Sequence, residues 1–65
     1  MEIEEFLITN NIKNSSVLAS MLGCSRATIS KRQAKGWLVD YYTVNGELIL
    51  GWLKPDGVLF FEGYQ

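Results

Sequence analysis

The stretch SSVLASMLGCSRATISKRQAKG, residues 15–36, decides the fold because it orders helix-starting and helix-ending residues around a short gap. Residues of N-cap type occupy positions 14–16, at and just before the beginning of this stretch, and they favour a helix start. Apolar side chains then repeat at helical spacing. They are Val17, Leu18, Met21 and Leu22. The pattern predicts a helix over about 15–22.

The same stretch predicts a turn and a second helix. Gly23 stands where a helix end favours a residue with positive φ, and Ser25 can cap a new start two positions later. The following helix is expected from about Arg26 to Lys35, with Gly36 as its stop. Two helices joined by a three-residue turn form a helix-turn-helix.

The sequence changes in character after the glycine at position 36. Aromatic and β-branched residues crowd residues 38–44, and a second apolar run occupies residues 47–53. Between them lies the pair Asn45 and Gly46, a strong signal for a two-residue hairpin turn. A β-hairpin is therefore predicted, although the periodicity of these runs also allows two helices.

The remaining segments complete one predicted domain over residues 1–65. Apolar spacing and early glutamates indicate a short first helix over about 2–9. A second turn is expected at 55–57, and residues 58–64 can pair as a third strand. The predicted fold class is α+β, with three helices before an antiparallel β-hairpin or three-stranded sheet. The alternative is an all-α fold of five helices.

Positive charge is concentrated in one part of a chain whose net charge is −1. Residues 6–39 contain no Asp or Glu but hold five of the six basic residues. These are Lys13, Arg26, Lys31, Arg32 and Lys35. Such a distribution suits a polyanion-binding surface, and equally a solvated basic helix face, so the charge alone does not decide.

The composition argues against an enzyme. The chain has no histidine and a single cysteine, Cys24, which rules out a Ser-His or Cys-His pair, an intrachain disulfide and a tetrahedral zinc site. We expect that thiol to be structural, and we expect no cofactor. The acidic first residues and the absence of a long apolar run predict a cytoplasmic protein that does not enter the membrane.

The predicted third helix has a distinctive outward face. With Ile29 pointing inward, small, hydroxylated or basic residues point outward. They are Ala27, Ser30, Lys31 and Ala34, flanked by Thr28 and Lys35. Small residues let a helix sit deep in the major groove, and Lys or Arg can reach guanine acceptors.

These residues carry a resemblance to a known family. The run LASMLGCSRATISK resembles the helix-turn-helix of phage Cro proteins and related phage repressors, and WLVDYYTVNGELILGWLKP is similar to the hairpin that follows it in lambda-type Cro. The resemblance implies two classes of contact to double-stranded DNA. The base-reading residues would be Ser25, Arg26, Ala27, Ser30 and Lys31, and the phosphate contacts Ser15, Ser16, Arg32 and Lys35. The family usually has an apolar residue where this chain has Arg32, which leaves Ile29 as the main expected anchor of the third helix.

The hairpin also resembles the wing of winged helix-turn-helix proteins, which touches the minor groove. Here the tip, residues 44–47, carries no basic residue and ends in Glu47, which phosphate would repel. We therefore expect the hairpin to serve association instead. Alternation along a strand leaves apolar side chains on both faces, which predicts a homodimer through residues 47–61. Its interface would include Leu50, Trp52, Leu59 and Phe60.

The functional expectation is a phage or prophage repressor that binds an operator as a homodimer in the bacterial cytoplasm, on the nucleoid, and needs no small-molecule ligand. Two alternatives remain open at this point. One is a protein-interaction module, an inhibitor or adaptor that retains a helix-turn-helix shape. The other is an architectural excision factor that binds DNA without regulating a promoter.

Overall fold

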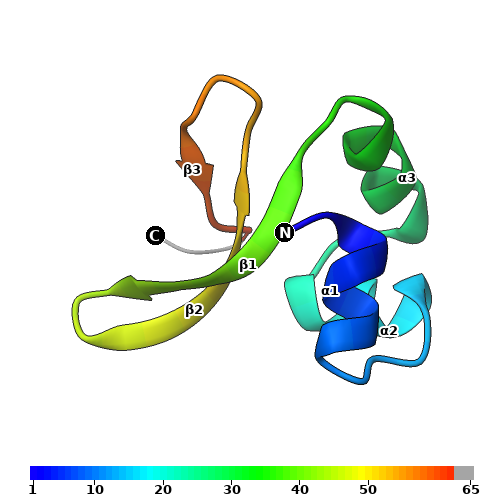
Figure 1. Cartoon of the computed structure of the whole chain (residues 1–65), viewed down its shortest axis with the longest axis horizontal. Coiled ribbons are helices and arrows are strands. Elements are labelled where there is room, and N and C mark those ends of the chain that lie inside the picture. Colours follow the sequence, from blue (N-terminus) through cyan, green and yellow to red (C-terminus); the bar gives the residue numbers. More distant parts are fainter. Residues whose placement is uncertain (63–65) are drawn as a thin grey trace.

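The computed structural model describes residues 1–62, in which three helices precede a three-stranded antiparallel sheet of order β1-β2-β3 (Figure 1). The elements are α1 (Ile3–Thr9), α2 (Ser15–Leu22), α3 (Arg26–Ala34), β1 (Leu38–Val44), β2 (Glu47–Leu53) and β3 (Leu59–Phe60). The α+β prediction is confirmed, and the all-helical alternative is wrong because residues 38–53 form a hairpin. Within residues 1–62, no helix has the length and apolar character needed to cross a membrane.

The ends of α2 and α3 follow from local hydrogen bonds. The side chain of Asn14 accepts a hydrogen bond of 3.0 Å from the backbone N–H of Val17. This bond fixes the start of α2 at Ser15. Gly23 ends that helix with φ +78°, a conformation that costs glycine little. Its N–H donates to the carbonyl of Ala19 over 2.9 Å. The boundaries expected for α2 are confirmed, and α3 ends one residue earlier than expected.

The hairpin turn uses the two residues that predicted it. Asn45 and Gly46 both have positive φ, at +51° and +80°, as a two-residue turn matching the twist of the strands requires. Strand pairing begins beside the turn, where Val44 lies opposite Glu47, and continues to Leu38 opposite Leu53. The turn therefore fixes the register of both strands.

A second turn returns the chain to the sheet. The N–H of Gly57 donates to the carbonyl of Lys54 over 2.9 Å, and the N–H of Val58 donates to the Asp56 carboxylate over 3.0 Å. The third strand is shorter than expected because pairing with β2 is confined to Leu59 and Phe60. The end of the predicted strand, residues 63–64, lies outside the described residues.

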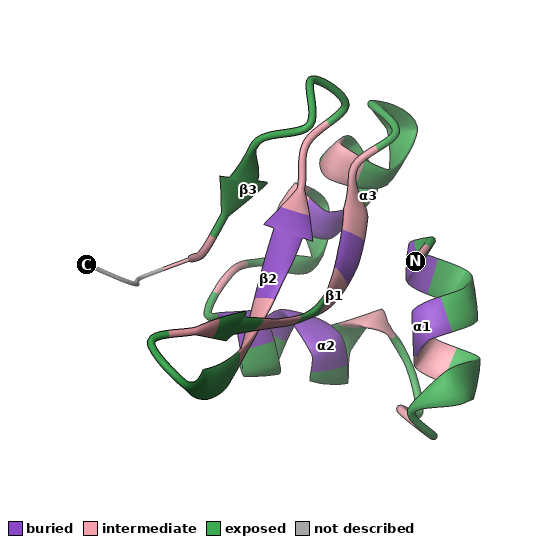
Figure 2. Ribbon diagram, turned by 60° about the vertical axis from the view of Figure 1, so that its left-hand side comes forward, coloured by how far each residue is buried: buried purple, intermediate pink, exposed green. Residues whose placement is uncertain are grey.

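One core joins the helices to the sheet, and Figure 2 shows its buried residues on the helices and on the part of the hairpin away from its turn. Its members are Ile3, Phe6, Leu18, Ala19, Leu22, Ile29, Val39 and Trp52. The last two are directly paired across β1 and β2, so this face of the hairpin packs on the helices. The hairpin tip extends past them (Figure 1), and Leu48 on the same face is 69% exposed.

The opposite face of the sheet is partly covered by a residue that directly follows β3. The ring of Phe61 lies directly over Gly51, where a Cβ atom would overlap it. The same ring meets Tyr42 edge-on at a centroid separation of 6.1 Å. Glycine in the middle of β2 is therefore required by a close contact with an aromatic ring rather than by backbone conformation.

Substitution of Gly51 by alanine tests this contact. We expect Gly51→Ala to lower the free energy of unfolding by about 1–3 kcal/mol, since the new methyl group must displace the Phe61 ring. The measurement is chemical denaturation, repeated in a Phe61→Ala background, where most of the penalty should disappear. A penalty of the same size in both backgrounds would show that the ring does not constrain this position.

Candidate nucleic-acid interface

Helices α2 and α3 and the turn between them form a helix-turn-helix. Leu18, Ala19 and Leu22 of α2 are buried in the same core as Ile29, the one buried residue of α3. The turn is closed at its start, because the N–H of Cys24 also donates to the carbonyl of Ala19, over 3.0 Å. α3 is thereby held on a short, fixed connection with one side turned to the core.

The outward face of α3 is exposed and basic. The predicted base-reading residues on it are all exposed. They are Arg26, Ala27, Ser30 and Lys31. Lys35, at the C-cap, is exposed as well. Within residues 1–62, no carboxylate lies within ion-pairing distance of these three cations. The structure thus brings three unpaired positive charges to one helix.

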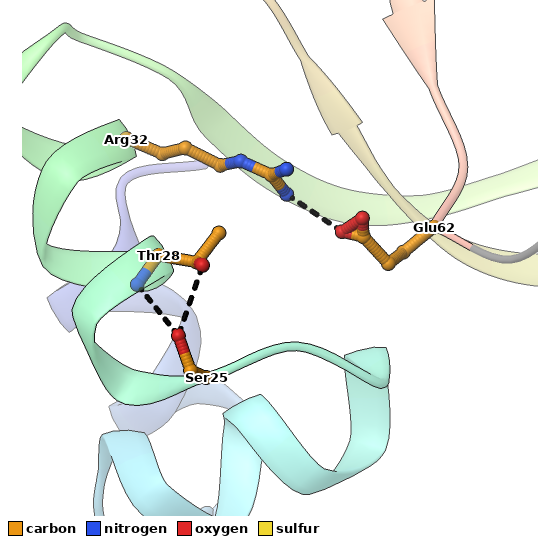
Figure 3. A network of polar contacts seen from close by, with 4 residues as sticks. All are labelled: Ser25, Thr28, Arg32 and Glu62. Carbon is orange, nitrogen blue, oxygen red and sulfur yellow. Dashed lines mark hydrogen bonds and ion pairs between the residues drawn. The ribbon is translucent and has the colours of Figure 1, made fainter.

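Ser25 and Thr28 have a structural role at the start of α3 (Figure 3). The Ser25 hydroxyl accepts a bond of 3.1 Å from the backbone N–H of Thr28, and the two hydroxyl oxygens lie 3.0 Å apart. The serine is therefore the N-cap of the helix, as its place in the sequence indicated. Thr28 is half-buried, whereas the residues of the outward face are exposed.

The serines predicted to bind phosphate lie in the first turn of α2. Ser16 is exposed and Ser15 is half-buried. The N–H groups at this end of a helix have no intrahelical partner and carry a partial positive charge. These residues are on a different helix from Lys31 and Lys35, so any DNA contact from them would involve another part of the backbone.

Arg32 does not share the exposed face of α3, in contrast to its expected place among the phosphate contacts. Its side chain is 16% exposed, and its Nη1 atom lies 3.1 Å from Oε1 of Glu62 (Figure 3). The guanidinium carbon lies 4.8–5.2 Å from the centroids of three rings. These rings, here called the aromatic cluster, belong to Trp37, Trp52 and Phe60.

A signal for this placement exists in the sequence. Arg32 follows Ile29 by three residues and therefore lies on the inward side of the same helix. The ion-pair partner of Arg32, Glu62, is thirty residues away, and no local sequence pattern connects these two residues. Arginine is suited to the position because its planar guanidinium stacks on rings and is weakly hydrated.

The side chain of Cys24 is half-buried beside this ion pair. Burial raises the pKa of the thiol above its ordinary value; the charge of Glu62 acts in the same direction, while that of Arg32 opposes it. A raised pKa keeps the thiol protonated at neutral pH, and a protonated thiol is a poor nucleophile. In the described part of the chain, no three Cys, Asp or Glu side chains are grouped so that they could hold a metal ion.

The residues predicted to form a dimer interface fall into two groups. Trp52 is fully buried in the core of its own chain and Leu50 is half-buried against that core. Leu59 and Phe60 are 43% and 36% exposed. Leu48, which lies within the predicted interface range 47–61, is 69% exposed.

Comparisons with protein-family models, with curated proteins and with solved structures identify no match to this chain. The case for a nucleic-acid interface therefore depends on the geometry and charge of α3 itself.

Proposed function

We propose that this protein is a sequence-specific double-stranded DNA-binding regulator that inserts α3 into the major groove. One observation carries the proposal. The exposed face of α3 presents Arg26, Lys31 and Lys35 without carboxylate partners in residues 1–62, on a helix that α2 and a closed turn hold in place. A protein with a net charge of −1 has no general excess of positive charge to account for this face.

The side chains on this face suit base recognition. Lys31 and Arg26 can donate to the O6 and N7 acceptors of guanine, the commonest specific contact in the major groove. Ala27 and Ser30 are small enough to let the helix approach the bases, and an alanine methyl group can touch the methyl group of thymine. Lys35, at the end of the helix, is placed to meet a phosphate.

Repression is the mode of regulation that a helix-turn-helix domain can carry out by binding alone. A domain that occupies an operator excludes polymerase by its presence, which requires no cofactor and no catalytic group. The resemblance of residues 15–55 to phage Cro proteins supports assignment to a phage or prophage. Binding to the host nucleoid in the bacterial cytoplasm follows from the same proposal.

A homodimer is part of the proposal. Beyond the residues that pair with β3, the outer edge of β2 from Glu47 to Leu50 is not paired with another described strand. Exposed apolar side chains lie on this part of β2 and on or beside β3, the strand that covers the rest of the same edge. They are Leu48, Val58, Leu59 and Phe60. A two-fold axis at this edge would relate two copies of α3. We expect such a dimer to bind two half-sites about 34 Å apart on DNA.

Substitutions on α3 distinguish base contacts from phosphate contacts. We expect Lys31→Ala and Arg26→Ala each to cost about 1–3 kcal/mol on the preferred duplex and much less on random duplex. Lys35→Ala should weaken both by the same factor and make the salt dependence of binding shallower by about one unit. The measurement is a gel shift between about 50 and 200 mM salt, over which phosphate-dependent affinity falls by orders of magnitude.

Three outcomes of that titration would contradict the assignment. Equal losses on preferred and random duplex would show that Lys31 contacts only phosphate. An unchanged salt slope for Lys35→Ala would remove it from the interface. A wild-type protein with no salt-dependent affinity for duplex DNA would favour the protein-interaction module instead.

Substitution of an exposed leucine tests the dimer. We expect Leu59→Asp to convert a dimer into a folded monomer in sedimentation at micromolar concentration, because a carboxylate cannot be buried between two copies without a partner. Ile8→Asp is the matched control, since Ile8 is exposed on α1, away from the sheet edge. A wild-type protein that sediments as a monomer while binding half-sites and palindromes equally well would exclude the dimer.

A further inference from the structure

Arg32 joins the DNA-facing helix to the end of the described chain. Its guanidinium contacts Glu62 at 3.1 Å, thirty residues later, and faces the aromatic cluster at 4.8–5.2 Å. The cluster brings together the residue before β1, a buried residue near the end of β2 and the last residue of β3. Four segments of the chain therefore meet at one arginine.

The surroundings of this arginine differ from those of a surface ion pair. The side chains of Arg32 and Glu62 are 16% and 21% exposed, so solvent screens their attraction only in part. The rings are themselves packed edge to face. Trp37 lies 5.9 Å from Trp52 and 6.0 Å from Phe60, with interplanar angles of 75° and 76°. The guanidinium thus meets a preformed aromatic surface.

The C-terminal segment, defined as residues 58–62, has few other attachments. Its backbone pairs with β2 at only two positions. The Val58 carbonyl also accepts a bond of 2.9 Å from the N–H of Lys54, and three of the side chains contact the rest of the domain. Phe60 meets Trp37 and Arg32, Phe61 covers Gly51, and Glu62 pairs with Arg32. Two of the three act through the same arginine.

Helix α3 is in a similar situation. It has nine residues, and Ile29 is the only one that is buried. A single apolar contact fixes the distance of a helix from the core but leaves rotation about that contact weakly restrained. Arg32, one turn further along on the same side, supplies the second contact that rotation would break.

We propose that Arg32 is a positioning residue: with the C-terminal segment it fixes the rotation of α3 on the sheet, and it does not neutralise DNA phosphate. The proposal rests on the proposed function in one respect, namely that the orientation of α3 determines which bases its outward face meets. Base preference then depends on Glu62 and Phe60, which lie outside α3.

The test uses a substitution for which simple electrostatics and the positioning role predict opposite changes in DNA affinity. Glu62→Ala removes a negative charge and leaves every cation in place, so electrostatics alone would tighten DNA binding. We expect it instead to lower affinity for the preferred duplex about tenfold, the cost of one misplaced base contact, with little change on random duplex. Glu5→Ala is the matched control, because Glu5 is exposed on α1 and its removal changes the net charge equally.

Arg32 variants complete the test. Arg32→Ala and Arg32→Lys should both reduce the ratio of preferred to random affinity, with the salt slope unchanged, at a temperature where each variant is fully folded. A slope that falls by about 0.9 in Arg32→Ala would show a lost phosphate contact and overturn the proposal. Unchanged or tighter binding of the preferred duplex by Glu62→Ala would overturn it as well.

A readout without DNA separates this proposal from the proposed function. The chain has two tryptophans, and both belong to the aromatic cluster around Arg32. Near-ultraviolet circular dichroism therefore reports on the site directly. We expect Glu62→Ala and Arg32→Ala each to change the tryptophan bands, and the double variant to add little. Additive changes would refute the coupling. Absence of duplex binding by the wild type would refute only the proposed function.

Discussion

Helix α3 buries a single side chain, so its orientation on the domain depends on contacts that other parts of the molecule make with it. Ile29 is 1% exposed, and no other residue of the nine-residue helix is buried. A helix so lightly anchored would be poorly oriented in isolation. The turn at Gly23 holds the approach from α2, and the hydroxyl of Ser25 completes the first turn of α3. The guanidinium of Arg32 secures the last turn. Because the anchoring is confined to one side, the opposite side remains free for a ligand.

The sheet provides the surface on which this arrangement is built. Two positive-φ residues at the hairpin turn fix the register, and the register places Val39 and Trp52 together beneath the helices. A second turn then returns residues 59–60 to the edge of β2, and the Phe61 ring lies on Gly51. A small domain has little apolar surface to bury, so contacts of this kind between distant segments contribute much of its stability.

Local signals predicted most of the fold, because caps, turns and helical spacing act over a few residues. Asn14, Gly23 and the Asn45-Gly46 pair each marked a boundary that the structure confirms. Contacts between distant segments were missed. Arg32 was assigned to phosphate because charge is visible in a sequence, whereas its partner thirty residues away is not. Trp52 was assigned to a dimer interface because alternation along a strand does not reveal which face meets the helices.

The central claim is that the outward face of α3 recognises DNA sequence. Selection of bound sequences from a random pool of duplex DNA tests this claim most directly. The wild-type protein should enrich a two-fold symmetric consensus, with half-sites centred about one helical turn apart or a multiple of that spacing. Guanine-containing positions should be among the most strongly selected, since Arg and Lys preferentially contact guanine in the major groove. A pool that shows no enrichment over its input after repeated rounds at physiological salt would contradict the claim.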